Sequence, residues 1–515
     1  MPRKTTSLPL NLAAPAAGAA LFRWLYEQLR TAILEGRLQP GARLPATRDL
    51  AKAYGLSRTT IVSAFEQLQS EGYIEARVGS GTRVSKVLPE ELLTVRGARK
   101  ERRGAADRDT ERRLAHRAIS LSAYAKRLKP FRTTPTHPVR AFRANQCALD
   151  LFPTALWAQV AASRLRRAST TLLAGGEPLG YRPLREAVAE YLNTSRGVKC
   201  REEQVLIVSG AQEGLDRTAR LLLNPNDPAW MEEPGYPGAA AVLRAAGATI
   251  CGVPIDQEGL DLEHGIRRSP NPKLVYVTPA HQFPLGVTMS LRRRLALLEW
   301  ARTSGVLIFE DDYDSEYRYS GRPVPALQGL DRAGVVIFGG SFSAVMFPAL
   351  RLGYLVVPEE MVDIFAAAQS VSTHHPPLLG QAVLCDFIRD GHFARHIRRM
   401  REVYAERLGV LLHAANKELR GLIEISNVEA GLQTIGCLHK GFSADKLVEG
   451  AAKREVELKS LSRYYSGKKQ MNGIVLGFAA VEPRELRRGV EELATLLQAK
   501  RSAHWRFSSA HPPAE

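Results

Sequence analysis

The sequence predicts a multi-domain protein with an N-terminal winged helix-turn-helix, a large and mainly parallel α/β domain, and a smaller C-terminal α+β lobe. Three observations support this prediction. The chain has 515 residues, more than one domain usually holds. Short helical patterns and a hairpin-like stretch occupy the first 85 residues. Beyond residue 200, continuous apolar runs alternate with helical patterns, which is typical of strands buried on both faces of a parallel sheet.

The composition is that of a globular protein, with 45% hydrophobic and 24% charged residues. No apolar stretch is long enough to span a membrane, and we expect a cytoplasmic protein. The five cysteines lie far apart without a C-x-x-C pair, which excludes a zinc ribbon and a thioredoxin-like motif. We therefore expect reduced thiols and no metal site.

The net charge of +18 is unevenly distributed. Residues 1–85 hold 11 basic and 6 acidic side chains, and residues 86–140 hold 15 and 6. The remaining residues hold 45 and 41 and are nearly neutral. A basic front end on a neutral body indicates a polyanionic partner, and double-stranded DNA is the partner we expect.

The N-terminal elements follow from short patterns. Leu25, Leu29 and Ile33 form a helical stripe within residues 23–34. Thr47 is expected to cap a second helix over 48–54. A third helix over 58–71 is expected to be capped by Ser57, with Ile61, Phe65 and Leu68 facing inward, and stretches 73–78 and 82–84 predict a β-hairpin wing.

A helix pair can be purely structural, and that alternative applies here. The exposed start of the third helix, Arg58-Thr59-Thr60, favours DNA binding, because this end enters the major groove in helix-turn-helix proteins. With the stretches Leu44–Ala51, Tyr54–Val62, Glu71–Ile74 and Gly79–Thr82, residues 20–85 resemble the GntR family of winged-helix regulators. The expected DNA-binding residues are Arg43, Arg48, Ser57, Arg58, Thr59, Thr60, Arg77 and Gly79.

The expected domain boundaries follow these changes of pattern. We expect an N-terminal arm (1–20), the winged helix (21–85), a basic linker (86–140), the large domain (141–390), the small lobe (391–500) and a tail (501–515). The linker is either a solvated spacer or a segment that adds nonspecific DNA affinity.

Four apolar runs, 205–208, 274–277, 306–309 and 335–338, predict strands of the large sheet. Open α/β sheets bind ligands at the carboxyl ends of their strands. The turn Ser209–Gln212 follows the first run and opens a helix, so its backbone N–H groups can hold a phosphate. This signal is weak when taken alone.

The stretch Glu310–Asp314 places four carboxylates after the third run. It could be a solvated turn, a magnesium site, or a carboxylate that pairs with a protonated ring nitrogen. Tyr236 could stack on a ring, and the segment Ser341–Arg351 offers hydroxyls and a guanidinium for a phosphate. Together these features describe a pyridoxal phosphate pocket.

The stretches Leu149–Pro153, Thr278–Pro284, Glu310–Glu316 and Phe347–Tyr354 resemble the fold-type I aminotransferases, from about Asn145 to Leu497. With the GntR-type front end, the chain resembles the MocR subfamily of regulators. The resemblance implies pyridoxal phosphate as cofactor and a homodimer, with Asp311 at the ring nitrogen, Tyr313 at the ring hydroxyl, Tyr236 stacked on the ring and Arg351 at the phosphate. The expected cofactor-binding residues are Ser209, Gly210, Ala211, Gln212, Tyr236, His281, Asp311, Tyr313, Ser341, Ser343 and Arg351.

The sequence departs from the aminotransferase pattern at three positions. Ala344 stands where the family has the lysine that forms the Schiff base, and a methyl group has no amine. No other lysine lies nearby in sequence. Gly175 stands where the family usually has a tyrosine, and Leu285 where it has a threonine. His281 is expected to be a hydrogen-bonded structural residue rather than a catalyst.

Three functions are compatible with these patterns. The first is a DNA-binding transcriptional regulator whose large domain forms the dimer and senses a small effector of amino acid or vitamer type. The second is an aminotransferase with an appended DNA-binding domain, which Ala344 argues against because the catalytic amine is missing. The third is a structural DNA-binding dimer without a ligand. The first hypothesis is the one we expect, with pyridoxal phosphate held noncovalently or not at all.

Overall fold

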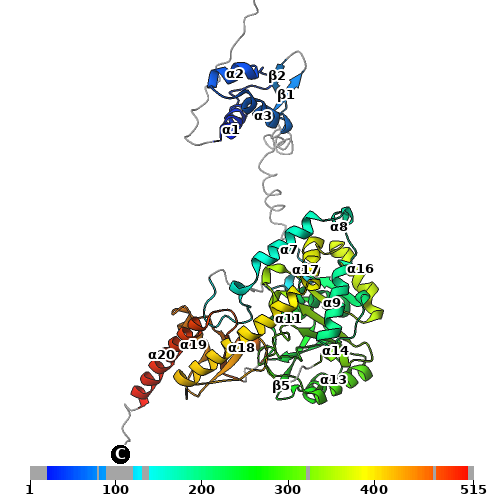
Figure 1. Ribbon diagram of the computed structural model, residues 1–515, viewed down its shortest axis with the longest axis vertical. Coiled ribbons are helices and arrows are strands. Elements are labelled where there is room, and N and C mark those ends of the chain that lie inside the picture. The colour runs from blue at the N-terminus through cyan, green and yellow to red at the C-terminus, as the bar shows by residue number, and fades with distance from the viewer. Residues whose placement is uncertain are drawn as a thin grey trace, which may run out of the picture. The chain divides into compact units, whose positions relative to one another are not determined.

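The computed structural model describes residues 20–77, 81–87, 120–129, 138–320, 325–467 and 471–508. The chain divides into two compact units, Met1–Ser120 and Leu121–Glu515. Figure 1 shows the elements of both units. No described helix is long and apolar enough to cross a membrane.

The described residues of the first unit form three helices and a hairpin: α1 (Leu21–Leu34), α2 (Thr47–Tyr54), α3 (Arg58–Ser70), β1 (Ile74–Arg77) and β2 (Gly81–Val84). The strands are antiparallel, with Ile74 opposite Val84. The winged helix-turn-helix predicted from sequence is confirmed. The N-cap of α3 is also confirmed, because the Ser57 hydroxyl accepts a hydrogen bond from the Thr60 amide. The predicted Thr47 cap is wrong, since Thr47 is the first helical residue and Ala46 precedes it without a side-chain cap.

The apolar residues that the sequence pattern predicts to face inward form part of the core of this unit. All the predicted inward residues of α1 and α3 are buried in one hydrophobic cluster: Leu25, Leu29, Ile33, Ile61, Phe65 and Leu68. Gly55 ends α2 with a left-handed φ of 64°, a conformation that glycine adopts without steric cost.

The second unit is built on an eight-stranded sheet in the order β3-β10-β9-β8-β7-β4-β5-β6. Its strands are β3 (Val205–Val208), β4 (Pro228–Glu233), β5 (Thr249–Asp256), β6 (Gly259–Leu260), β7 (Leu274–Val277), β8 (Leu307–Asp312), β9 (Val336–Ser341) and β10 (Gly353–Val356). The pairs β4–β5, β4–β7, β7–β8 and β8–β9 are parallel. Strand β10 is antiparallel to both β3 and β9. The predicted mainly parallel sheet is therefore confirmed.

Helices surround this sheet (Figure 1). They are α7 (Thr154–Arg166), α8 (Thr170–Ala174), α9 (Arg182–Ser195), α10 (Ala211–Leu222), α11 (Pro237–Ala246), α12 (Leu262–Arg268), α13 (Leu291–Ser304), α14 (Leu327–Leu330), α15 (Phe342–Val345), α16 (Val362–Thr373) and α17 (Leu378–Arg389). Short 3₁₀ turns lie at Leu149–Leu151, Glu202–Gln204, Pro348–Leu350 and Glu359–Met361.

The smaller lobe has a four-stranded antiparallel sheet in the order β11-β12-β14-β13. Its elements are α18 (His392–Glu418), β11 (Ile423–Ile425), β12 (Gln433–Leu438), α19 (Ala444–Ala452), β13 (Lys459–Ser460), a 3₁₀ turn (Leu461–Tyr464), β14 (Gly473–Gly477) and α20 (Pro483–Ser508). The helices α18, α19 and α20 lie together beside this sheet in Figure 1. The α+β character predicted for the C-terminal segment is seen here.

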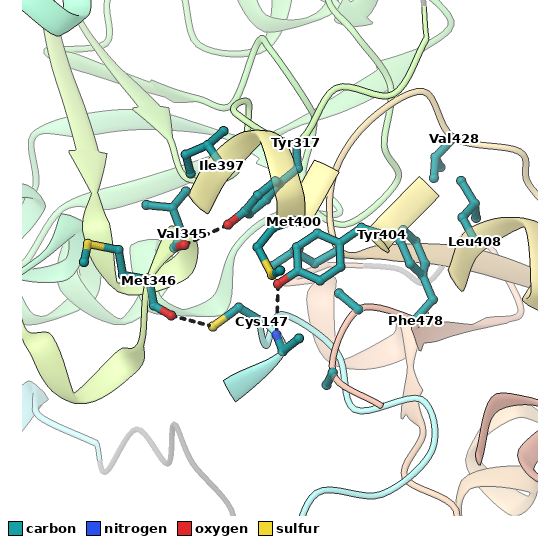
Figure 2. Close-up of a cluster of buried hydrophobic side chains, with 14 of the residues drawn as sticks. Cys147, Tyr317, Val345, Met346, Ile397, Met400, Tyr404, Leu408, Val428 and Phe478 are labelled. Carbon is teal, nitrogen blue, oxygen red and sulfur yellow. Dashed lines mark hydrogen bonds between the residues drawn. The ribbon is translucent and has the colours of Figure 1, made fainter. Parts of the chain in front are cut away.

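A buried cluster holds the end of the short helix α15, which contains Ala344. The Tyr317 hydroxyl donates to the Val345 carbonyl at 2.8 Å, and the Cys147 thiol donates to the Met346 carbonyl at 3.3 Å (Figure 2). The Tyr404 hydroxyl accepts from the Ala148 amide at 2.9 Å. Because these carbonyls are held inside the core, the backbone just after Ala344 has one defined position.

Part of the expected linker packs on the second unit. Helix α6 (Ala123–Arg127) lies against α11, and the Arg127 guanidinium donates to the Ala245 carbonyl at 3.0 Å. The Tyr124 ring lies 4.9 Å from the Arg220 guanidinium, which also donates to its hydroxyl. The second compact unit, Leu121–Glu515, therefore includes the last part of the expected linker. The five-residue helix has too few apolar residues to be recognised from periodicity.

Candidate ligand-binding and DNA-binding sites

The exposed start of α3 is the candidate DNA-binding surface of the first unit. Arg58 and Thr59 are exposed, and Thr60 is half-buried. The Ser57 hydroxyl lies 2.8 Å from that of Thr59 and 2.7 Å from that of Thr60, so these side chains form one ordered polar group at the helix N-terminus. Arg43 and Arg48 are also exposed. The expected contacts Gly79 and the side chain of Arg77 lie outside the described residues.

A cavity of about 670 Å³ is the candidate ligand site of the second unit. It lies at the carboxyl ends of β8 and β9 and at the start of α10. Most of the predicted cofactor-binding residues line it: Gly210, Ala211, Gln212, Tyr236, Asp311, Tyr313, Ser341, Ser343 and Arg351. Ala344 lines the same cavity.

Asp311 is a buried carboxylate at the cavity wall. One carboxylate oxygen accepts a 2.6 Å hydrogen bond from the Tyr276 hydroxyl, and the other has no hydrogen-bond partner within the described structure. Burial raises the pKa of Asp311 to about 7. A cationic ring nitrogen bound in the cavity would supply the missing partner and favour the ionised carboxylate.

The other acidic residues of this stretch have structural partners. Glu310 accepts from the amides of Leu327 and Gln328, and Asp314 lies 3.0 Å from His281 Nδ1. The Asp312 carboxylate pairs with Arg196 at 3.0 Å. All four carboxylates are buried, so the solvated-turn alternative is wrong. The described residues contain no cluster that could hold a metal ion, which leaves the magnesium alternative without a ligand set.

The start of α10 and Arg351 lie at one end of the cavity, the candidate anion-binding end. A Cβ atom at Gly210 would lie 3.9 Å from both terminal nitrogens of Arg351, so this glycine leaves the space in front of the guanidinium open. Within the described residues, Arg351 makes no hydrogen bond or salt bridge. A helix N-terminus facing a free guanidinium is suited to a phosphate.

Ser209 is placed differently from the expectation. Its amide and its hydroxyl both donate to Glu213 Oε2 at 2.6 Å. It lines a neighbouring cavity and not the one that contains Asp311. The Ser209 amide and hydroxyl are therefore both hydrogen-bonded to Glu213, which lies one helical turn further along α10.

The aromatic residues form one wall of the cavity. The rings of Tyr236 and Tyr313 each meet Phe283 edge to face at 5.6 Å. Burial raises the pKa of Tyr236 to about 12, so its hydroxyl remains protonated at neutral pH. His281 does not line the cavity and lies behind Tyr313, whose hydroxyl is 3.0 Å from its Nδ1 atom.

The two serines lie at the turn into α15. The Ser341 hydroxyl accepts from the Ser343 amide at 3.2 Å. The Ser343 hydroxyl is buried and has no hydrogen-bond partner within the described part of the chain. It is a second polar group of the cavity wall that a ligand could satisfy.

Lys459 is a lining residue that the sequence did not reveal. It comes from β13 of the small lobe, more than one hundred residues after Ala344, and is the one lysine among the described lining residues. A two-residue strand carries no periodic signal. Of the other two departures from the aminotransferase pattern, Leu285 packs beside the wall and Gly175 lies near His375, and neither lines the cavity.

Each of the two units is similar to a known protein family. Residues 23–84 match the family model for bacterial regulatory proteins of the gntR family, and residues 140–440 match aminotransferase class I and II. The probable rhizopine catabolism regulatory protein MocR of Rhizobium meliloti is 39% identical over 487 residues, covering 95% of this chain and 96% of the relative. The 2-aminoadipate transaminase of Thermus thermophilus is 30% identical and covers 70% of this chain and 90% of the relative.

Solved structures match the second unit. The α-aminoadipate aminotransferase LysN from Thermus thermophilus, in complex with N-(5'-phosphopyridoxyl)-L-leucine, has a TM-score of 0.66 and 29% identity and covers 71% of this chain and 93% of its own. The kynurenine aminotransferase of Pyrococcus horikoshii also has a TM-score of 0.66, with 25% identity and coverage of 78% and 96%. The second unit therefore has the fold of the fold-type I aminotransferases.

A GntR-type winged helix joined to an aminotransferase-like domain defines a class of helix-turn-helix transcriptional regulators. Relatives that cover both units are regulators, whereas the similarity to the transaminase leaves out almost a third of the chain. The chain belongs to the MocR-type regulators within this class.

Proposed function

We propose that this regulator binds a phosphopyridoxyl compound noncovalently in its second unit and responds to it by changing its affinity for DNA. The observation that carries the proposal is Asp311, a buried carboxylate with one unsatisfied oxygen in a cavity that also contains Arg351 and Ala344. The fold supports a pyridoxal phosphate-type ligand, and Ala344 supports the absence of a covalent link.

The lining residues fit such a ligand in chemical character. The start of α10 and Arg351 would hold the phosphate, Asp311 the protonated ring nitrogen, and Tyr236 the face of the ring. When bound to a lysine, pyridoxal phosphate supplies an electron sink for reactions of amino acids. Here Ala344 offers no amine, so we propose binding and signalling without transamination.

Binding and covalent attachment can be separated experimentally. We expect wild type to bind pyridoxamine phosphate, measured by calorimetry, and Arg351→Ala to bind it at least tenfold more weakly, because a charge-assisted phosphate contact is lost. After incubation with pyridoxal phosphate and borohydride, mass spectrometry should find label at residue 344 in Ala344→Lys only. Leu291→Lys, which adds a lysine at an exposed position on α13, is the matched control. Label at a native lysine in wild type would contradict noncovalent binding.

We further propose that the chain is a homodimer that forms through the second unit. Two apolar side chains of α16, Ile364 and Val371, are 52% and 90% exposed and line one common cavity. Arg351 lines this cavity as well as the candidate ligand site. A second copy of the chain on this face would bury the apolar surface beside the anion-binding end.

The DNA-binding part of the proposal rests on the exposed α3 start, which would enter the major groove. Two copies in a dimer would read two half-sites. A gel shift with and without pyridoxamine phosphate tests the coupling between the units. Equal DNA affinity in both conditions would contradict the proposed response.

A further inference from the structure

A second cavity of the second unit, of about 450 Å³, is separate from the candidate ligand site. It is formed by the end of α9, the chain that follows β8, and the first turns of α18. None of its described lining residues lines the candidate ligand site. Asp311 lines that site, and the next residue, Asp312, pairs with Arg196 of the second cavity. Because successive side chains of a strand point to opposite faces, the two cavities flank the end of β8.

The second cavity is rich in guanidinium groups. Its charged side chains, among the described lining residues, are four arginines and one glutamate: Arg196, Arg318, Arg398, Arg401 and Glu316. Asp312 neutralises Arg196, at 3.0 Å, and Glu429 pairs with Arg318. Two of the four positive charges are therefore compensated by carboxylates of the protein.

The other two arginines have no carboxylate partner. Arg398 is exposed and makes no hydrogen bond or salt bridge within the described part of the chain. Arg401 donates at 2.8 and 3.1 Å to the backbone carbonyl of Glu316, which is a neutral acceptor. The two arginines are three residues apart on α18 and so share one face of the helix. Burial raises the pKa of Glu316 to about 7, so its carboxyl group balances only part of this excess positive charge at neutral pH.

Unpaired hydrogen-bond donors belong to residues of the same cavity. Ser315 Oγ and Arg318 Nε are buried and have no hydrogen-bond partner within the described residues. The Nε atom of an arginine can only donate, and a serine hydroxyl can donate as well. Both groups therefore lack an acceptor oxygen. An anion with several oxygen atoms would supply these acceptors and also balance the charge of Arg398 and Arg401.

The size of the charge excess and the apolar wall narrow the class of anion. A phosphate monoester carries about −1.5 to −2 charges at neutral pH and has three strong acceptor oxygens, whereas a carboxylate carries one charge. Rings and an alkyl side chain complete the lining, with Tyr191 and Phe393 edge to face at 5.3 Å and Ile397 on the same helix as Phe393. Such a wall suits the organic group of a small ester.

We propose that this second cavity binds a small phosphate monoester, independently of the candidate ligand site. Arg398 and Arg401 hold the phosphate, and Ser315 and Arg318 donate to its oxygens. A phosphate of the DNA backbone is a diester with one negative charge, and it matches the charge excess less well. The inference does not depend on a phosphopyridoxyl ligand, because it assigns a different cavity and different residues.

Phenyl phosphate and phenyl sulfate test the proposal, since they have the same shape and differ by about one charge at about pH 8. We expect wild type to bind phenyl phosphate more tightly than phenyl sulfate by on the order of tenfold, measured by calorimetry. Arg398→Gln should weaken phenyl phosphate by on the order of tenfold, and Ser315→Ala by a few fold. Arg399→Gln is the matched control and should bind as wild type, because Arg399 is exposed on the same helix and does not line the cavity.

Several results would overturn the proposal. Wild type could fail to bind phenyl phosphate, or could bind succinate more tightly, which would assign a dicarboxylate. Equal losses in Arg398→Gln and Arg399→Gln would indicate a general charge effect. If Arg351→Ala abolished binding of phenyl phosphate and Arg398→Gln did not, the probe would occupy the candidate ligand site instead. Thermal melting checks that each variant is folded, which we expect for Arg398→Gln because Arg398 has no partner to lose.

Discussion

At the candidate ligand site, burial leaves some charged side chains without enough hydrogen-bond or ion-pair partners from the protein. Asp311 and Lys459 are both only partly satisfied by the protein, and each lies in surroundings that disfavour its charge. On the same strand, Asp312 pairs with the Arg196 guanidinium through one of its oxygens, and Glu310 accepts from two backbone amides. Asp311 has no charged partner and bonds only to the Tyr276 hydroxyl, so its partners, rather than its residue type, separate it from these two carboxylates.

The first prediction concerns the stability of the ligand-free protein. The pKa of Asp311 is raised to about 7, so between its ordinary pKa and this value the folded state holds a proton that the unfolded state has lost. Stability therefore falls as pH rises through this window. Asp311→Asn removes that loss, and we expect its melting temperature to exceed that of wild type by a few degrees at about pH 8 and by less at about pH 5. An equal difference at both pH values would contradict the raised pKa.

The second prediction concerns DNA recognition by α3. Arg58→Ala should weaken binding to the specific site by about 1–3 kcal/mol, because a base or phosphate contact is lost. Fluorescence anisotropy with a labelled operator measures the change. Arg23→Ala is the matched control, since Arg23 is 79% exposed on α1 and pairs with Glu27. Equal losses in both variants would indicate a general charge effect and not a reading helix.

At the level of elements, the short helix α6 lies near the start of the second unit. Helix α6 precedes the range predicted for the large domain and yet packs on α11 and on Arg220 of α10. The same α10 begins at the candidate anion-binding end of the cavity. One helix therefore contacts both the candidate ligand site and the segment that leads to the first unit.

The third prediction tests the packing of α6. Tyr124→Ala removes the ring that lies over Arg220 together with its hydrogen bond. We expect amide hydrogen exchange in residues 123–127 to become faster by on the order of tenfold, because a local cation–π contact and a hydrogen bond are lost. Lys126→Ala changes an exposed position of the same helix and should leave exchange unchanged. Unchanged exchange in Tyr124→Ala would mean that other contacts hold the helix.

At the level of the whole molecule, the two units have separate hydrophobic cores. The first unit carries the candidate DNA-binding surface, and the second carries the candidate ligand site and the proposed dimer face. In such an arrangement, the second unit would determine how two DNA-binding units are presented to two half-sites. Its assembly state is therefore part of the regulatory mechanism that we propose.

The fourth prediction concerns this assembly. Light scattering at micromolar concentration should give wild type twice the chain mass of 56.7 kDa. Val371→Asp should give the mass of one chain, because a charge replaces a 90% exposed apolar side chain at the proposed contact. Leu291→Asp, at a 59% exposed position on α13, should remain dimeric. A monomeric wild type would contradict the dimer, and a dimeric Val371→Asp would contradict this face.

The sequence by itself determined the elements whose signals are local. The apolar stripes of α1 and α3 and the runs that became β3 and β7 were predicted from residues at fixed short spacings, because a helix repeats every 3.6 residues and a fully buried strand is apolar throughout. The candidate residues from Gly210 to Arg351 could also be named, since strand ends and their polar turns are local motifs.

Only the tertiary structure decided which side chains share the cavity. In the folded chain, Lys459 of the small lobe lines the cavity that contains Ala344. The amide and hydroxyl of Ser209 donate to Glu213, and His281 lies behind Tyr313. The tertiary structure also placed α6 on the second unit and β10 antiparallel between β3 and β9. These facts depend on contacts between segments far apart in the chain. No local periodicity encodes such contacts, because they arise when separate elements bury their faces against one another.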